Sequence, residues 1–454
     1  MLKYNTRSRR VWTTIIVVGL AGAFAVAGSY SAGASPKAAA GGTPIQQKIA
    51  AALQKPTKLV FWGWAPQTAP MVAAFEKQYP KVKVDYVDME VDSSEYAKLD
   101  TAIKAGSGIP DVVQFDYSAL PQFVLSQAVL NLSNYGVSSL ANTYTKVAWS
   151  QVNLDGGIYG VPQDSGPLAL FYNKTVFDKY GLTVPTTWAQ YVADAKKLHQ
   201  ENSSEYMAAD SGDPTVADSM IWQAGGKPFQ FSGTSGTVNL SDPGTLKWAS
   251  AYGQLLKQGL LYTNAPLYTP AWVTGIKNGT FASWITGGWG VGTLQYFAPT
   301  SSGDWRVAQV PQYTAGAHAS AQQGGSSTSV MNASTNKLAA IGFAEWFSTN
   351  AKAISTWQTY GGFPSQRSVI SSSAWLNNPL SYFGGEKVDQ IFAASENDTL
   401  GGWQYLPYNV YANSVFSDSA GQAFAGKVSL AAGLKAWQKL IITYGNLEGF
   451  NVSS

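Results

Sequence analysis

The chain has 454 residues, of which 45% are hydrophobic and 13% charged, and its formal net charge is +3. This length suffices for two or three domains with large cores. The absence of cysteine excludes disulfides, thiol catalysis and Cys-ligated metals. The two histidines, His199 and His318, lie far apart without any ligand spacing, so the sequence predicts neither a metal site nor a cofactor.

Residues 1–34 have the pattern of a signal peptide or N-terminal anchor. An apolar run over 11–28 follows a basic start, and Ala32-Gly-Ala34 suits a cleavage site between small residues. The run is also long enough for a marginal membrane span, so an uncleaved anchor stays an alternative. Ser29 stands where a lipoprotein would carry its lipidated cysteine, which excludes a thioether lipid anchor.

These features predict an extracytoplasmic protein that is secreted, held at the cell surface or periplasmic. The basic residues of the leader are Lys3, Arg7, Arg9 and Arg10, so the remainder of the chain carries about one negative charge. A basic footprint for nucleic acid is missing, and no nucleic-acid partner is expected.

The rest of the chain alternates between strand and helix patterns, which predicts an α/β fold. Residues 35–57 are rich in Ala and Gly and are expected to form a linker or a loose first helix, whereas 315–329 is expected to be a loop. Strands are predicted over 59–64, 82–86, 111–116, 168–172, 281–285 and 306–310. Apolar residues at helical spacing predict helices around 71–79, 96–103 and 430–444, and Thr187-Trp-Ala-Gln190 is a capping box that opens another.

Several motifs occur in a recognisable order. They are Phe75-Glu-Lys-Gln-Tyr-Pro80, Ala102-Ile-Lys-Ala-Gly-Ser-Gly-Ile-Pro-Asp-Val-Val-Gln-Phe-Asp116, Gly156-Gly-Ile-Tyr-Gly-Val-Pro162, Leu168-Ala-Leu-Phe-Tyr-Asn-Lys174, Gly181-Leu-Thr-Val-Pro-Thr-Thr-Trp188 and Asn278-Gly-Thr-Phe-Ala-Ser-Trp-Ile-Thr-Gly-Gly-Trp289. Each is loose alone, but the series resembles the extracellular solute-binding proteins of ABC importers. Within these it is most similar to the sugar-binding family that contains maltose-binding protein.

The resemblance implies a two-lobed periplasmic-binding-protein fold of type II, in which discontinuous lobes are joined by three hinge crossings. We expect the crossings near Val161–Ser165, Val310–Pro311 and Phe363–Arg367. The N-lobe would then comprise 58–162 with 312–364, and the C-lobe 165–310 with 366–454. The resemblance further implies a monomer that performs no chemistry, binds a carbohydrate and delivers it to the membrane subunits of an ABC permease.

Residues that follow predicted strands are the candidates for ligand contact, because ligands of open α/β sheets collect beyond the strand ends. A sugar needs flat aromatic surfaces for its C–H faces and directed polar partners for its hydroxyls. Arg306 and Arg367 are the only arginines after the leader, which disfavours an amino-acid site. The predicted ligand-binding residues are Trp64, Gln67, Asp116, Asp164, Trp222, Trp289, Ser326, Tyr360 and Trp403.

The sequence leaves two other classes of function open. A secreted glycoside hydrolase needs only two carboxylates across an aromatic cleft, although the common nucleophile-elbow, Walker and zinc-protease motifs are missing from the sequence. A carbohydrate-binding surface scaffold would need no defined cleft.

Overall fold

The computed structural model describes residues 43–454 except 90–92. The predicted signal peptide or anchor over 1–34 lies outside the described residues, as do 35–42. None of the helices that the structure describes is long and apolar enough to cross a membrane.

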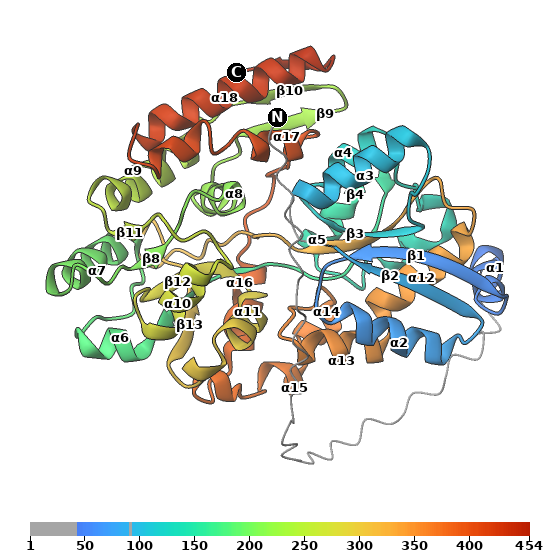
Figure 1. Cartoon of the computed structure of the whole chain (residues 1–454), viewed down its shortest axis with the longest axis horizontal. Helices are drawn as coiled ribbons and strands as arrows, with labels where there is room; N and C mark the ends of the chain where they lie inside the picture. The colour runs from blue at the N-terminus through green and yellow to red at the C-terminus, as the bar shows by residue number, and fades with distance from the viewer. Residues whose placement is uncertain (1–42, 90–92) are drawn as a thin grey trace, which may run out of the picture. The chain divides into compact units, whose positions relative to one another are not determined.

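The first lobe is built on a five-stranded sheet with the order β2-β1-β3-β14-β6. β1 runs parallel to β2 and β3, whereas β14 is antiparallel to β3 and β6. Helices α3 and α4 lie on one side of this sheet and α2, α12 and α13 on the other (Figure 1). The strands are β1 (Thr57–Gly63), β2 (Val82–Asp88), β3 (Val112–Asp116), β6 (Val161–Pro162) and β14 (Ser326–Val330).

The helices of this lobe are α1 (Pro44–Ala52), α2 (Thr68–Gln78), α3 (Ser93–Ala105), α4 (Leu120–Leu125), α5 (Lys146–Val152), α12 (Lys337–Thr349) and α13 (Ala351–Thr359), and the hairpin β4 (Asn153–Leu154) and β5 (Gly157–Ile158) follows α5. Helix α1 falls within the segment expected as a linker or loose first helix. Thr43 and Gln46 form a capping box at its start. Ile49 and Leu53 are buried against α12, so this segment belongs to the folded core.

The prediction of a loop over 315–329 is wrong at its end, because β14 begins at Ser326. All five residues of β14 are buried although four of them are Ser or Thr. The strand lies in the sheet between β3 and β6, where ladder hydrogen bonds satisfy its backbone. These residues are buried because the strand is central in the sheet. Their polar side chains give no sign of this burial in the sequence.

The second lobe is built on the antiparallel sheet β12-β7-β13. Side chains of β7 alternate between two cores: Leu168 and Leu170 point into one, and Ala169 and Phe171 into the other. The strands are β7 (Leu168–Asn173), β12 (Ser283–Gly287) and β13 (Trp305–Gln309), with small sheets from β8 (Ala208–Ala209) and β11 (Leu261–Tyr262) and from β9 (Phe229–Ser232), β10 (Ser235–Val238) and β15 (Asn451–Ser453).

The helices of the second lobe surround these sheets (Figure 1). They are α6 (Lys174–Lys179), α7 (Trp188–Glu201), α8 (Pro214–Gln223), α9 (Pro243–Lys257), α10 (Pro270–Asn278), α11 (Gly290–Phe297), α14 (Arg367–Ile370), α15 (Ser373–Leu376), α16 (Val388–Asn397), α17 (Asn409–Ser414) and α18 (Leu430–Leu447). The predicted capping box of Thr187 and Gln190 is present at α7. Trp188, Trp248 and Trp437 are buried in the core of this lobe.

Three segments connect the lobes. The backbone bonds that these segments make indicate where each lobe begins and ends. Gln312 bridges Thr187, and Gln322 bridges Pro167, so 312–322 contacts the second lobe. Gln163 donates its backbone N–H to the carbonyl of Ser326 in the first lobe at 2.8 Å. We therefore propose that the second crossing lies at 323–325 rather than at the expected Val310–Pro311, with 312–322 in the C-lobe.

Candidate functional site

A buried polar network joins the strand ends of the first sheet. Gln114 of β3 donates from Nε2 to Ser326 Oγ at 3.1 Å, and its Oε1 accepts from the backbone N–H of Trp64 at 3.3 Å. Gln114 is buried, so these bonds satisfy its amide away from water. The ends of β1, β3 and β14 are thereby tied to one another.

Asp164 extends this network to the crossings. Its Oδ1 accepts from the backbone N–H of Ser326 at 2.7 Å and from Ser326 Oγ at 2.6 Å. The backbone of Asp164 bridges Pro364 of the third crossing, and its carbonyl accepts from the Tyr117 hydroxyl at 3.0 Å. Burial raises the pKa of Asp164 to about 7, although the hydrogen bonds from Ser326 lower it in part. The predicted residues Asp164 and Ser326 thus contact each other where the three crossings meet.

Asp116 and Trp289 face the same short stretch of the second crossing from opposite lobes. A Cβ placed on Gly324 would lie 3.5 Å from Asp116 Oδ2 and 3.6 Å from Trp289 Nε1. That Nε1 donates to the carbonyl of Gln323 at 2.8 Å. Burial raises the pKa of Asp116, and the negative charge of Asp213 in the second lobe adds to the rise. The structure therefore brings two more predicted residues together.

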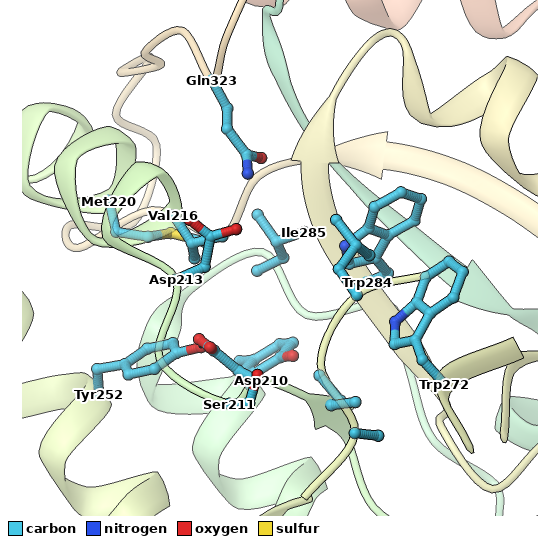
Figure 2. A pocket seen from close by; sticks show the side chains of 15 residues that line it. Asp210, Ser211, Asp213, Val216, Met220, Tyr252, Trp272, Trp284, Ile285 and Gln323 are labelled. Atoms are coloured by element: carbon cyan, nitrogen blue, oxygen red, sulfur yellow. The ribbon is translucent and has the colours of Figure 1, made fainter. Parts of the chain in front are cut away.

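A cavity of about 50 Å³ opens beside Gln323 in the second lobe. In Figure 2 the Gln323 side chain points toward it, with Asp213 on one side and Trp284 on the other. Trp272 and Asp210 line its deeper part. Gln323 is 3% exposed and its Oε1 has no hydrogen-bond partner, so this carbonyl is an acceptor that a ligand hydroxyl could satisfy.

The carboxylates of this region differ in their hydrogen bonds. Asp210 Oδ2 accepts from the Tyr252 hydroxyl at 2.5 Å, and burial raises the pKa of Asp210 to about 6. Asp213 caps α8 by accepting from the backbone N–H of Thr215 at 2.8 Å. Asp218 is 1% exposed with Oδ1 unpartnered, and burial raises its pKa well above the usual range.

Indole rings form the wall of the cavity that faces Asp213 (Figure 2). Trp284 meets Trp272 edge to face at 5.1 Å between ring centres and meets Trp289 at 5.6 Å. Indole faces and carboxylates together can hold a polyhydroxylated ring, because they match its C–H faces and its hydroxyls respectively. The cavity is smaller than the roughly 300–1,000 Å³ of small-molecule pockets. Apart from Gln323, the residues that line it belong to the second lobe, so further contacts to a ligand of disaccharide size would have to come from the first lobe.

Trp222 and Trp403 pack on each other. Their rings are stacked at 4.0 Å, and Tyr405 meets both edge to face. Trp222 is 1% exposed and Trp403 8%, so most of both rings is in the core of the second lobe. Tyr405 is half-buried and also packs against the core of the first lobe. The stack thus supports a contact between the lobes, and direct ligand contact by Trp222 and Trp403 stays a prediction.

The remaining predicted residues lie at element ends. Trp64 follows β1 and is half-buried against the first core. Gln67 is buried at the start of α2. Tyr360 ends α13, is 45% exposed, and has its carbonyl close to Gly292 of α11. Their roles as ligand contacts also stay predictions.

Sequence reasoning missed most of the cavity wall. Asp213 had a usable signal, because Asp-Pro at a helix start is a common cap, with proline at the first helical position. Gln114 had another, as a polar residue inside an apolar strand. Trp284 was passed over inside a predicted strand, and Gln323 stood in a predicted loop. Their convergence depends on contacts between distant segments.

Comparison with known proteins gives consistent results. The family model described as bacterial extracellular solute-binding protein matches residues 64–354. The ABC transporter associated binding protein from B. animalis subsp. lactis Bl-04, solved in complex with beta-1,6-galactobiose, is 36% identical, with a TM-score of 0.82 over 87% of this chain and 99% of that one.

Two further proteins are similar over most of their length. The galacto-N-biose-/lacto-N-biose I-binding protein of the ABC transporter from Bifidobacterium longum, solved with lacto-N-biose, is 26% identical, with a TM-score of 0.76 over 87% of this chain and 98% of that one. The lactose-binding protein of Rhizobium radiobacter is 28% identical over 74% of this chain and 81% of its own length.

Proposed function

The chain belongs to the bacterial extracellular solute-binding protein family, and we propose that it captures a short oligosaccharide and delivers it to the membrane permease of an ABC importer. It has the two-lobed fold of type II periplasmic-binding proteins and acts outside the cytoplasm, as members of this family do. The observation that carries the proposal is the cavity between indole rings and carboxylates beside the second crossing.

Disaccharides that contain galactose are the first ligands to test. Beta-1,6-galactobiose, lacto-N-biose and lactose stand in the names of the three similar proteins, and each sugar contains galactose. A neutral sugar suits this site, because the residues that line the cavity include carboxylates, amides and aromatics but no lysine or arginine. The ligand would bind one lobe in the open state and gain contacts to the other on closure.

The chain is further proposed to act as a monomer without catalytic activity. Its attachment would be through the permease, or through the N-terminal segment if that segment is retained. A glycoside hydrolase with the same carboxylates would convert its ligand, whereas a scaffold would bind no free sugar selectively.

A thermal-shift screen with mono-, di- and oligosaccharides tests this function. Ligand at 100 times its dissociation constant stabilises the folded state by about 2.7 kcal/mol, which raises the melting temperature by a few degrees at this size. We expect a selective shift with galactose-containing disaccharides and quantitative recovery of the intact sugar after hours of incubation. Conversion of the sugar would support the hydrolase, and no shift with any sugar would contradict saccharide capture.

A further inference from the structure

Tyr268 has a backbone conformation that normally belongs to glycine. Its φ is 67°, and the backbone N–H of Thr269 bonds the carbonyl of Pro266 at 3.2 Å, which closes a turn around Leu267 and Tyr268. The third position of such a turn with positive φ usually holds Gly or Asn, because a larger side chain is strained there. The chain therefore keeps an aromatic ring at a position where its backbone is disfavoured.

The ring lies beside the cavity. Leu267, the preceding residue, lines the cavity, as does Trp272 one turn into α10. The Tyr268 ring stacks on Phe297 at 5.4 Å and meets the Trp272 ring edge to face at 6.1 Å. Tyr268 is thus held by two aromatic contacts next to residues that line the cavity.

The ring is partly exposed and partly enclosed. It is 45% exposed, so much of its surface is free for contact. Burial of its hydroxyl end raises the pKa of its phenol to about 12, and the charge of Asp213 adds to the rise. The ring is therefore partly enclosed by its neighbours while much of its surface stays accessible.

We propose that Tyr268 is a specificity-determining residue, whose exposed face stacks on the second sugar ring of a disaccharide held in the cavity. This inference rests on the proposed function. Stacking on an aromatic face requires a ring held in one orientation, which the turn and the contacts with Phe297 and Trp272 provide. The turn is strained because Tyr268, and not a glycine, occupies its position of positive φ.

The test uses the full chain and calorimetric titration with beta-1,6-galactobiose and with galactose. Tyr268→Gly removes the ring together with its contacts to Phe297 and Trp272, and glycine adopts the positive φ of this position without strain. The dissociation constant of this variant for the disaccharide should rise about fivefold or more, with little change for galactose. Tyr268→Phe should bind like the wild type.

Tyr296→Ala is the matched control, since Tyr296 is 72% exposed and also contacts Phe297. It should leave both affinities unchanged. Unchanged disaccharide affinity in Tyr268→Gly would overturn this inference while the proposed function stands. Failure of the wild type to bind any saccharide would overturn both.

Discussion

At the scale of single residues, the candidate site depends on side chains that the fold collects from separate segments. Asp116 ends a strand of the first lobe, Trp289 precedes a helix of the second, and the carbonyl of Gln323 between them belongs to a crossing. The Asp116 carboxylate and the Trp289 indole N–H both lie close to Gly324, and the indole N–H donates to the Gln323 carbonyl. We therefore expect a change at any of them to affect both ligand binding and the contact between the lobes.

Trp289→Ala should weaken disaccharide binding. The substitution removes an indole that meets Trp284 and donates to Gln323, and lost stacking area is expected to cost more than about 1 kcal/mol. Calorimetry would measure the dissociation constant, with Trp289→Phe as the control that keeps a ring but loses the N–H donor. A dissociation constant unchanged in the alanine variant would remove Trp289 from the site.

Asp164 should make stability depend on pH. Burial raises its pKa from 3.8 to about 7 in the folded state, so the folded chain holds this proton more tightly than the unfolded chain. Its contribution is fully present below about pH 4 and is lost as pH rises through 7, at about 1.4 kcal/mol per unit of pKa difference.

The check is urea denaturation of the wild type and Asp164→Asn between pH 4 and pH 8. The wild type should lose stability relative to the variant as pH rises, while the exposed control Asp155→Asn should follow the wild type. Glu345 and Asp389, whose pKa values burial also raises to about 7, act equally in all three proteins. Parallel profiles for wild type and Asp164→Asn would contradict the assignment.

At the scale of elements, apolar periodicity and capping residues predicted a helix or strand correctly where the pattern lay within that element's own sequence. The strand predicted over 168–172 is β7, and the stripe over 430–444 is α18. Periodicity failed for β14, whose Ser and Thr side chains are buried by neighbouring strands. It also gave no signal for the short helices α14, α15 and α17, which are four to six residues long and are held by tertiary contacts.

Helix α1 should contribute to global stability. Leu53 directly follows it, is 5% exposed, and would meet any Cβ added at Gly342 of α12. Leu53→Ala should lower the free energy of unfolding by about 2–5 kcal/mol through the cavity it leaves. Chemical denaturation would measure this, with the exposed Gln54→Ala as control. Equal stability of the two variants would show that α1 does not belong to the cooperative core.

At the scale of the whole molecule, the proposed closure depends on the crossings between the lobes. Pro162, Pro311 and Pro364 lie within the three predicted crossings, whose positions stay predictions, and Pro311 is followed by a segment that still contacts the second lobe. Among the predicted site residues, the structure brings Asp164 to Ser326 and Asp116 toward Trp289. It also packs Trp222 on Trp403, a contact between chain segments far apart that composition could not indicate.

The close approach of two crossings should be necessary for closure. A Cβ on Gly166 would lie 1.9 Å from the carbonyl oxygen of Gln323, so Gly166→Ala must push these backbones apart. We expect a loss of disaccharide affinity of tenfold or more, on the order of 1.4 kcal/mol, together with a lower melting temperature. Gly253→Ala, in α9, is the control for which affinity should not change, because an added Cβ there makes only an ordinary contact with Leu430 at 3.9 Å. Wild-type affinity in Gly166→Ala would show that this contact is dispensable.

Small-angle X-ray scattering with and without saturating beta-1,6-galactobiose tests most directly whether the lobes close on a saccharide. The cavity beside Gln323 is lined almost entirely by the second lobe, so the proposed capture needs the first lobe to close over the sugar. We expect a smaller radius of gyration with the sugar, at unchanged monomer mass, and no change with a sugar that gives no thermal shift. A radius that stays constant when calorimetry shows the site to be saturated would contradict capture by closure of the lobes.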